Sequence, residues 1–295
     1  MIRAASFSQG DASAAFDGMA DAYDATFTDS LIGRSQRNVV WHALENTFRI
    51  GDCVLELNCG TGEDAFFLAK RGVSVLACDA SARMISVAQH RKTREAPNSS
   101  LQFRVLKNED IDTLTAVDRF DGVLSNFSGL NCVQHLPAVA RTLADLVKPG
   151  GAAVLCLSTR VCLWEIAWYG LRGNLKKAFR RLPGATVATL NGIPVPVWYP
   201  TIASVRRAFS PSFRLRSIRA VGLFVPPSYA EPWIERHQQA LKSFEALDRV
   251  FGTWPGFRGV GDHVLLQFER TSELRHRSKT LRFTALLDRV PARTI

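Results

Sequence analysis

A glycine-rich turn and one carboxylate are the residues best suited by type and spacing to do chemistry. The turn, Glu56-Leu-Asn-Cys-Gly-Thr-Gly62, follows a short apolar run and precedes a helical pattern. Glycines let the backbone approach a ligand closely, and the first amides of a helix can donate hydrogen bonds to it. Asp79 follows a second apolar run about 20 residues later, where a carboxylate can accept both hydroxyls of a ribose. Together they predict a cofactor that contains a nucleoside.

The elements that must position these residues follow a strand–helix alternation. We expect strands over 53–58, 73–78, 101–106, 120–125 and 152–158, with helices over 63–71, 81–92 and 138–147 between them. Two further strands are expected over 213–225 and 261–270, joined by a helix over 231–251. This pattern is typical of a parallel sheet covered by helices on both faces. The predicted fold is α/β: a doubly wound, seven-stranded, mostly parallel sheet that binds its ligand at the carboxyl ends of the strands.

Composition shifts divide the chain into five predicted segments. They are N-terminal cap helices over 1–50, the cofactor-binding core over 51–159, an inserted substrate cap over 160–212, the last two strands and their helix over 213–270, and a basic tail over 271–295. Within the insertion, 160–182 has a helical pattern, the prolines and glycines of 183–200 favour turns or a short hairpin, and 201–209 favours a helix. We expect the tail to be partly disordered.

The overall composition is that of a globular protein with an excess of basic residues. The 295 residues carry a formal net charge of +10, and basic clusters lie at 172–181 and 206–219. No apolar run is long enough for a membrane-spanning helix, and residues 1–21 lack the pattern of a signal peptide, so a cytoplasmic location is expected. The six cysteines lie mostly in apolar runs without metal-ligand spacing, which favours reduced thiols and no metal. The basic clusters leave contact with a membrane surface open.

Two cofactor classes fit the turn. Gly60-x-Gly62-x-x-Ala65 satisfies the dinucleotide fingerprint, so an NAD-binding reductase is one alternative. Against it, Glu56 interrupts a strand that is normally apolar in dinucleotide domains, and a Lys-Pro-Gly-Gly turn at 148–151 belongs to a different pattern. A segment over 15–27, upstream of the first strand, also has no place in such a domain, which starts at its first strand.

The chain resembles class I S-adenosylmethionine-dependent methyltransferases, of the group that includes quinone and other small-molecule enzymes. The resemblance covers about residues 14–160 and the last two strands. It is carried by V-L-E-L-N-C-G-T-G-E-D, V-L-A-C-D-A-S-A-R-M, F-D-G-V-L-S-N-F-S-G-L-N-C-V, L-V-K-P-G-G and the upstream A-F-D-G-M-A-D-A-Y-D. Asn58 replaces the usual first glycine of the turn, and Asn tolerates left-handed geometry. Lys107 stands where many relatives have an aspartate that reads the adenine.

The resemblance implies S-adenosyl-L-methionine as cofactor and a role for each matching residue. The residues implied to bind it are Tyr23, which would close over the cofactor; Glu56, Asn58, Gly60 and Gly62, at the methionine part; Asp79, at the ribose; Ala80, Met84, Asn108 and Glu109, around the adenine; and Asn126 and Phe127, which would flank the methionine and the methyl group.

The substrate and the catalytic base are less defined. Aromatic and basic residues of the insertion, which we expect to lie over the mouth of the sheet, suggest an apolar or aromatic small-molecule substrate; the candidates are Trp164, Trp168, Tyr169, Arg172, Trp198 and Tyr199. His135 is a weak candidate for a base, and aligning the reactants and excluding water can suffice without one. A nucleic-acid (RNA) methyltransferase is the second alternative because the chain is basic, but Asn126-Phe-Ser-Gly129 lacks the prolines usual in enzymes that methylate nucleic-acid amines. The oligomeric state stays open.

Overall fold

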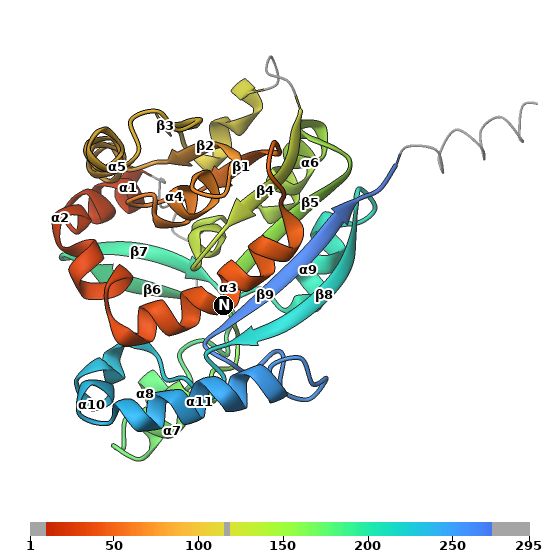
Figure 1. The fold of residues 1–295 in the computed structure, drawn as a ribbon. Coiled ribbons are helices and arrows are strands. Elements are labelled where there is room, and N and C mark those ends of the chain that lie inside the picture. The colour runs from red at the N-terminus through yellow and green to blue at the C-terminus, as the bar shows by residue number, and fades with distance from the viewer. Residues whose placement is uncertain (1–9, 115–118, 273–295) are drawn as a thin grey trace, which may run out of the picture.

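A seven-stranded sheet in the order β3-β2-β1-β4-β5-β9-β8 forms the centre of the computed structural model, which describes residues 10–114 and 119–272 (Figure 1). The strands are β1 (Cys53–Leu57), β2 (Ser74–Asp79), β3 (Leu101–Val105), β4 (Phe120–Ser125), β5 (Val147–Ser158), β8 (Phe213–Val221) and β9 (His263–Arg270). Neighbours among β1–β5 pair in parallel, whereas β9 runs antiparallel to both β5 and β8. The predicted doubly wound, mostly parallel sheet is confirmed.

Helices cover both faces of this sheet and create two separate cores. The helices around the parallel strands are α1 (Gly10–Asp17), α2 (Ala20–Tyr23), α3 (Leu31–Thr47), α4 (Glu63–Ala69), α5 (Ala82–Glu95) and α6 (Leu136–Leu146), with short turns η1 (Asp24–Thr28), η2 (Asn108–Leu114) and η3 (Gly129–Cys132). One core includes α6 together with Leu55 and Leu57, which lie on one face of β1. The other includes α3, α4, α5 and Val54 from the opposite face of β1. This alternation along β1 is the two-residue period of a strand buried on both sides.

The insertion lies between β5 and β8, where the sequence predicts it. It contains α7 (Leu163–Gly170), α8 (Leu175–Ala178), a two-stranded sheet of β6 (Ala185–Leu190) and β7 (Ile193–Trp198), and α9 (Ile202–Phe209). The hairpin and α9 agree with the sequence pattern. The single helical stretch over 160–182 is corrected, because Gly173 adopts a φ of +70° and ends it between α7 and α8.

A second correction concerns the expected helix over 231–251. It is two helices, α10 (Glu231–Arg236) and α11 (Gln238–Phe251), preceded by the turn η4 (Ser228–Ala230). His237 breaks the helical path with φ −130° and ψ 49°, and its ring stacks on Trp233. The predicted basic tail lies outside the described residues from position 273 onward.

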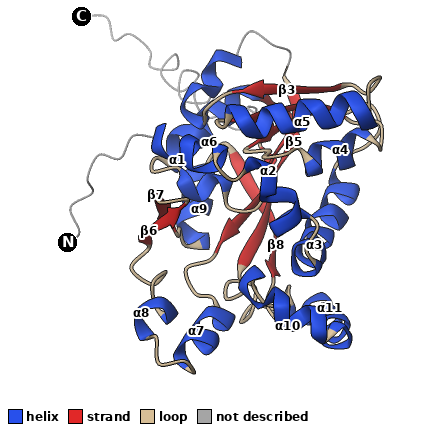
Figure 2. Ribbon diagram, turned by 90° about the vertical axis from the view of Figure 1, so that its left-hand side faces the viewer, coloured by secondary structure: helices blue, strands red, loops and turns tan. Residues whose placement is uncertain are grey.

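A buried ionic clasp fixes the insertion to the sheet. Arg181, just before the hairpin, donates to Glu165 of α7 at 2.9 Å and to Asp262, which precedes β9, at 2.8 Å. All three side chains are buried, so each charge depends on its partners. Figure 2 shows the result: α7 and α8 lie at one end of the molecule, and the chain returns from α8 into β6.

Other sequence expectations concern the whole described part of the chain. Within residues 10–114 and 119–272, no helix is long and apolar enough to cross a bilayer. All six cysteines are free thiols, four of them buried. In the same residues, no group of three or more His, Cys, Asp or Glu side chains is arranged to hold a metal ion.

Candidate functional site

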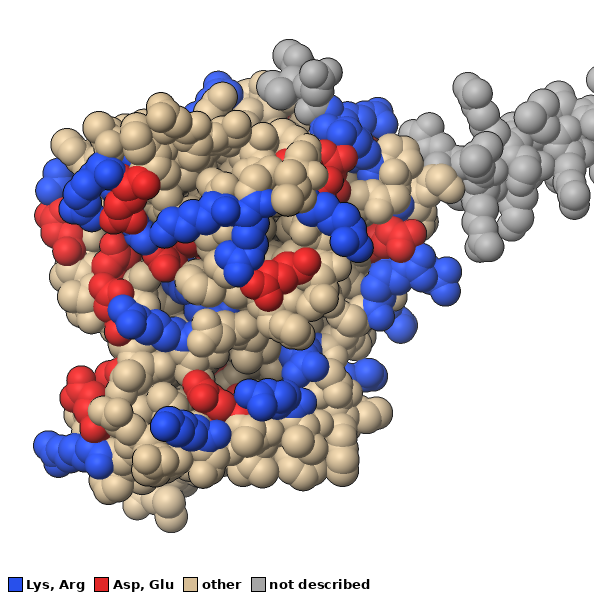
Figure 3. Space-filling model, in the orientation of Figure 1, with Lys and Arg blue, Asp and Glu red and all other residues tan. Residues whose placement is uncertain are grey.

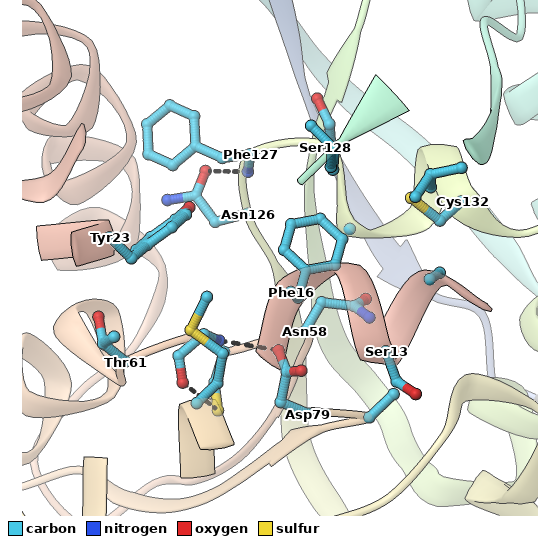
Figure 4. A pocket seen from close by; sticks show the side chains of 18 of the residues that line it. Ser13, Phe16, Tyr23, Asn58, Thr61, Asp79, Asn126, Phe127, Ser128 and Cys132 are labelled. Carbon is cyan, nitrogen blue, oxygen red and sulfur yellow. Dashed lines mark hydrogen bonds between the residues drawn. The ribbon is translucent and has the colours of Figure 1, made fainter. Parts of the chain in front are cut away.

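A cavity of about 280 Å³ opens at the carboxyl ends of β1, β2 and β4. Asn58, Asp79 and Asn126 reach it from the ends of these three strands (Figure 4). The strand ends meet at one edge because the strands are parallel, which is where ligands bind in open α/β sheets. Helix α1 and the β6–β7 hairpin form the opposite walls.

The turn after β1 has the geometry that its sequence predicts. Asn58 adopts the left-handed conformation with φ +57°, and Gly60 and Gly62 have φ +54° and +85°. Gly62 begins α4 and does not line the cavity; a Cβ there would lie 2.7 Å from the ring of Phe103. Gly62 is therefore required for packing α4 against β3, and Gly60 leaves its backbone open toward the cavity.

Asp79 faces this turn and ties it to the end of β2. One carboxylate oxygen accepts the backbone N–H of Gly60 at 2.9 Å, and the other accepts that of Ser81 at 2.8 Å. Burial raises the pKa of Asp79, although these amide hydrogen bonds oppose the shift. Each carboxylate oxygen retains lone-pair capacity for a ligand in the cavity. The carboxylate and the turn thus lie together, with open space beside them.

The N-terminal helices form a lid over the turn. Phe16 of α1 and Tyr23 of α2 line the cavity, and Figure 4 shows both rings directed into it. Asp17 holds α1 in place by accepting hydrogen bonds from the hydroxyl of Ser81 and from the backbone N–H of Arg83 at 3.0 Å. Burial raises the pKa of Tyr23 to about 12, so its hydroxyl stays protonated at neutral pH.

A buried ion pair in the cavity wall was not predicted. Arg37 of α3 donates to Asp64 of α4 at 2.6 Å, and Asn126 donates to the same oxygen at 2.9 Å. Burial disfavours the charge of Arg37, but the carboxylate of Asp64 outweighs this and raises the pKa of Arg37. Trp41 completes the set by donating to the second Asp64 oxygen at 2.7 Å. The sequence does contain a signal for this residue: Arg37 lies between Ile32 and Val40, at a position where the helical period places it on the buried face of α3.

Glu56 lies behind this ion pair rather than in the cavity. Its side chain is buried, and one of its oxygens has no hydrogen-bond partner among the described residues. Burial raises the pKa of Glu56 well above its usual value, and the nearby Asp64 carboxylate adds to the shift. The sequence-based expectation of a methionine contact through water stays a prediction for this residue.

Phe127, after β4, is held in an uncommon backbone conformation. Phe127 and Ser128 have φ +41° and +70° in succession. The Phe127 ring lies 4.9 Å from the Arg37 guanidinium and 5.4 Å from the ring of His263, measured between centres. Non-glycine residues in this region cost free energy and persist where surrounding contacts fix them, which is common at ligand sites.

The residues expected around the adenine divide between two cavities. Ala80, Met84 and Asn108 line the main cavity. Glu109 is exposed and lines a neighbouring cavity of about 260 Å³, together with His135 and Trp198. His135 is the exposed residue before α6, and its side chain does not cap the helix.

Most of the predicted substrate residues lie elsewhere, and the expectation that they cover the mouth of the sheet is corrected. Trp164 donates to the carbonyl of Phe224 at 2.8 Å, and Trp168 and Tyr169 pack on Tyr229. Arg172 lies over Trp168, and Tyr199 is buried beside Arg181. Contacts with Tyr229 of η4 and Phe244 of α11 hold the aromatic residues of α7 there.

The β6–β7 hairpin, and not the predicted substrate residues, forms the apolar wall of the main cavity. One face of it lines the main cavity through alternate residues of each strand, namely Ala188, Leu190, Val195 and Val197. With Phe16 and Cys132 they make this side apolar. Sequence reasoning identified the hairpin but not its role; the signal was the alternation of apolar and polar residues along 185–190.

Comparisons with known proteins agree with this geometry. Residues 54–151 match the family described as Methyltransferase domain. The demethylmenaquinone methyltransferase of Mycobacterium marinum is 32% identical over 149 residues, which are 50% of this chain and 58% of that protein. The 2-phytyl-1,4-naphtoquinone methyltransferase of Synechococcus elongatus is 33% identical over 146 residues, 48% of this chain and 60% of that protein. The matches thus span less than two thirds of either relative.

A solved structure extends the likeness of fold to most of the chain. The cyclopropane synthase MmaA2 of Mycobacterium tuberculosis has a TM-score of 0.58, with 14% sequence identity, over 89% of this chain and 98% of that one. At this identity the likeness concerns the fold alone. Residues 54–151 thus match a methyltransferase domain, and the likeness of the rest of the chain to a solved structure is one of fold.

Proposed function

We propose that this protein transfers a methyl group from S-adenosyl-L-methionine to an O, N or C atom of a small apolar or aromatic metabolite by in-line displacement. The observation that carries the proposal is the Asp79 carboxylate, which bonds the Gly60 amide at the edge of the cavity. The turn and the carboxylate are the two parts that a nucleoside-containing ligand needs.

The polar groups of the cavity wall fit the cofactor at both ends. Asp79 has acceptor capacity for ribose hydroxyls, and Ala80, Met84 and Asn108 border the space beside it. At the other end, the Nε of Arg37 is buried without a hydrogen-bond partner among the described residues. A carboxylate, as in an amino acid, is the ligand group that would satisfy it. Arg37 and Asp79 would thus hold opposite ends of the molecule.

The reaction asks the protein chiefly for positioning. When bound, S-adenosyl-L-methionine supplies a methyl group on a positively charged sulfur, already activated toward a nucleophile. Phe16, Tyr23 and Phe127 enclose the space above the turn with aromatic rings, which exclude water and favour a nearby positive charge. The Tyr23 hydroxyl stays protonated at neutral pH and therefore does not act as a base. An acceptor that loses its proton readily is therefore favoured, because alignment then supplies most of the catalysis.

The apolar hairpin wall supports an apolar acceptor. Leu190, Val195 and Val197 offer no hydrogen bonds from their side chains, so they select for shape and apolar surface. Two similar proteins are named as methyltransferases of a menaquinone precursor and of a phytyl naphthoquinone, both ring compounds. A substituted aromatic ring is the acceptor class that we propose to test first.

Calorimetry with S-adenosylhomocysteine tests the cofactor assignment. We expect saturable binding by the unmodified protein and no heat signal with NADH. Asp79→Ala should lower the affinity for S-adenosylhomocysteine by about tenfold or more, because hydrogen bonds to a charged group are worth about 1.5–3 kcal/mol. Asp145→Ala, which removes an exposed aspartate of α6, is the matched control and should bind normally. NADH binding, or full affinity in Asp79→Ala, would refute the assignment. Labelled methyl transfer to a host extract then identifies the acceptor.

A further inference from the structure

The positive charge of this protein comes from one continuous stretch. Residues 166–230 contain ten Lys or Arg residues and no Asp or Glu. The stretch therefore carries the whole formal charge of +10, and the rest of the chain has 27 basic and 27 acidic residues. On the face drawn in Figure 3, acidic and basic side chains are interspersed. Three of its cations, Arg180, Arg181 and Arg216, form ion pairs with acidic side chains outside the stretch, whereas the other seven cations of the stretch form none with the described residues. Unpaired charges of one sign attract an anionic partner.

Exposed apolar side chains gather in the same part of the chain. Of the twelve large hydrophobic residues that are exposed in the described part of the protein, six lie between positions 163 and 187. Leu171 is 88% exposed and Leu175 is 61% exposed. The other four are Leu163, Phe179, Leu182 and Val187. Single exposed apolar residues are ordinary, but a cluster marks an interaction surface.

The cations of this cluster lie among the apolar residues. Arg172, Lys176 and Lys177 alternate in sequence with Leu171 and Leu175 around the start of α8. The Arg172 guanidinium lies 3.7 Å from the centre of the Trp168 ring, and the Lys177 ammonium lies 5.4 Å from that of Tyr169. Neither lysine forms an ion pair with an acidic side chain among the described residues. Trp and Tyr beside basic side chains are typical of the boundary between lipid headgroups and acyl chains.

This surface leads directly to the apolar wall of the cavity. The chain passes from Leu182 into β6, whose Ala188 and Leu190 line the cavity while Val187 between them and the cluster is exposed. Figure 2 shows α8 at the end of the molecule, connected by one rising segment to the hairpin. A partner at α8 would thus be joined by one connecting segment to the element that we propose contacts the acceptor.

We infer that the surface formed by Leu171, Arg172, Leu175, Lys176, Lys177 and Phe179 docks on a lipid bilayer that carries anionic headgroups. Charge complementarity selects the partner: phosphate-bearing headgroups pair with the cations, and the exposed leucines and Phe179 enter the apolar layer beneath them. A nucleic acid offers phosphates but no apolar layer for Leu171 and Leu175, so the apolar half of the surface would remain without a contact. The inference concerns where the protein works and does not depend on the proposed activity.

Vesicle co-sedimentation of the full chain tests the inference. We expect binding to vesicles of phosphatidylcholine with phosphatidylglycerol, and much weaker binding to pure phosphatidylcholine or at high salt. Lys176→Glu/Lys177→Glu should lower the partition coefficient by about tenfold or more, since each cation near an anionic surface contributes about 1 kcal/mol. Leu171→Ser/Leu175→Ser should also lower it by about tenfold while the salt dependence persists. Both changes are at exposed positions, and an unchanged thermal melt verifies folding.

The matched control is Lys70→Glu/Arg141→Glu, which changes the net charge equally at exposed positions just after α4 and on α6. It should bind vesicles nearly as well as the unmodified protein. Equal losses in the control and in Lys176→Glu/Lys177→Glu would overturn the inference, since general charge would then suffice. So would a dimer in solution that Leu171→Ser/Leu175→Ser abolishes without any vesicle binding, or a tRNA shift that requires the lysines alone. Calorimetry with S-adenosylhomocysteine on the same variants measures ligand binding independently, so a failure of the docking inference can be distinguished from a failure of the proposed function.

Discussion

Arg37 and Asp64 show how a single buried pair supports the cavity wall. Both side chains are about 5% exposed and lie 2.6 Å apart. We predict that Arg37→Met lowers the free energy of unfolding by about 3–5 kcal/mol, because it leaves the Asp64 carboxylate buried without its cation. Urea denaturation measures this change. The double variant Arg37→Met/Asp64→Asn should recover part of the loss, since no uncompensated charge remains.

Arg34→Met is the control for that prediction, because it removes the same kind of ion pair from the same helix. Arg34 pairs with Asp29 at 2.8 Å, but both side chains are more than half exposed. Solvent screening reduces such a pair to about 1 kcal/mol or less. Similar losses in Arg34→Met and Arg37→Met would contradict a special role for burial.

Whether a residue of the site could be predicted depends on how far away in the sequence the residues that determine its role lie. Asp79 and Asn58 were predictable because each follows a strand and has a conformational or chemical reason to be there. Arg37 was not, because its partner Asp64 lies 27 positions away and only the packing of α3 against α4 brings them together. A sequence pattern reports local geometry, whereas ion pairs between helices depend on tertiary structure.

At the scale of elements, the two faces of one hairpin strand have different surroundings: one faces the cavity and the other is exposed to solvent. Leu190 faces the cavity, and its neighbour Thr189 is exposed on the opposite face of β6. We predict that Leu190→Asp raises the KM for an apolar acceptor at least tenfold, because a desolvated carboxylate opposes it, and leaves S-adenosylhomocysteine affinity nearly unchanged. Thr189→Asp should alter neither. Steady-state methyl transfer and calorimetry check both; an equal effect of the two variants would mean that the hairpin does not contact the acceptor.

Helix α11 carries a pH-sensitive contact to the loop after β8. Asp248 accepts the amide of Phe224 at 2.6 Å, and burial raises its pKa to about 6, although this and neighbouring amides oppose the shift. Because the folded state holds the proton more tightly than the unfolded one, this contribution is full below about pH 4 and is lost by about pH 6. We predict that the stability difference between the unmodified protein and Asp248→Asn changes by about 3 kcal/mol over that range. Urea titrations at several pH values measure it, with Asp145→Asn as control; parallel curves would contradict the assignment.

The elements that sequence reasoning missed share one cause. The pattern over 231–251 is continuous, and the break at His237 arises where its ring stacks on Trp233. Likewise, the aromatic residues of α7 were expected over the cavity, but contacts with Tyr229 and Phe244 direct them to the other helices. Periodicity locates an element and its apolar face, whereas the choice among several apolar surfaces is made by the packed molecule.

At the scale of the whole molecule, the cavity is closed by segments that are far apart in the sequence. Helix α1 contacts strand β7, and the side chain of Asn191 donates to the carbonyl of Ala15 at 3.5 Å. The sequence predicts a mostly parallel sheet and the place of the insertion, but not that the lid and the insertion meet. That contact depends on the return of the chain from the clasp at Arg181.

This closure predicts a shared response to the ligand. Near 100 times its dissociation constant, a ligand adds about 2.7 kcal/mol to the free energy of opening at its site. We therefore expect S-adenosylhomocysteine to slow amide hydrogen exchange in residues 12–23 and 185–198 together, and to leave α11 unchanged, because α11 does not line the cavity. Exchange followed by mass spectrometry measures this, and Asp79→Ala should remove both effects at once. Protection of only one segment would show that the lid and the hairpin act separately, since a ligand enclosed by both must restrain both.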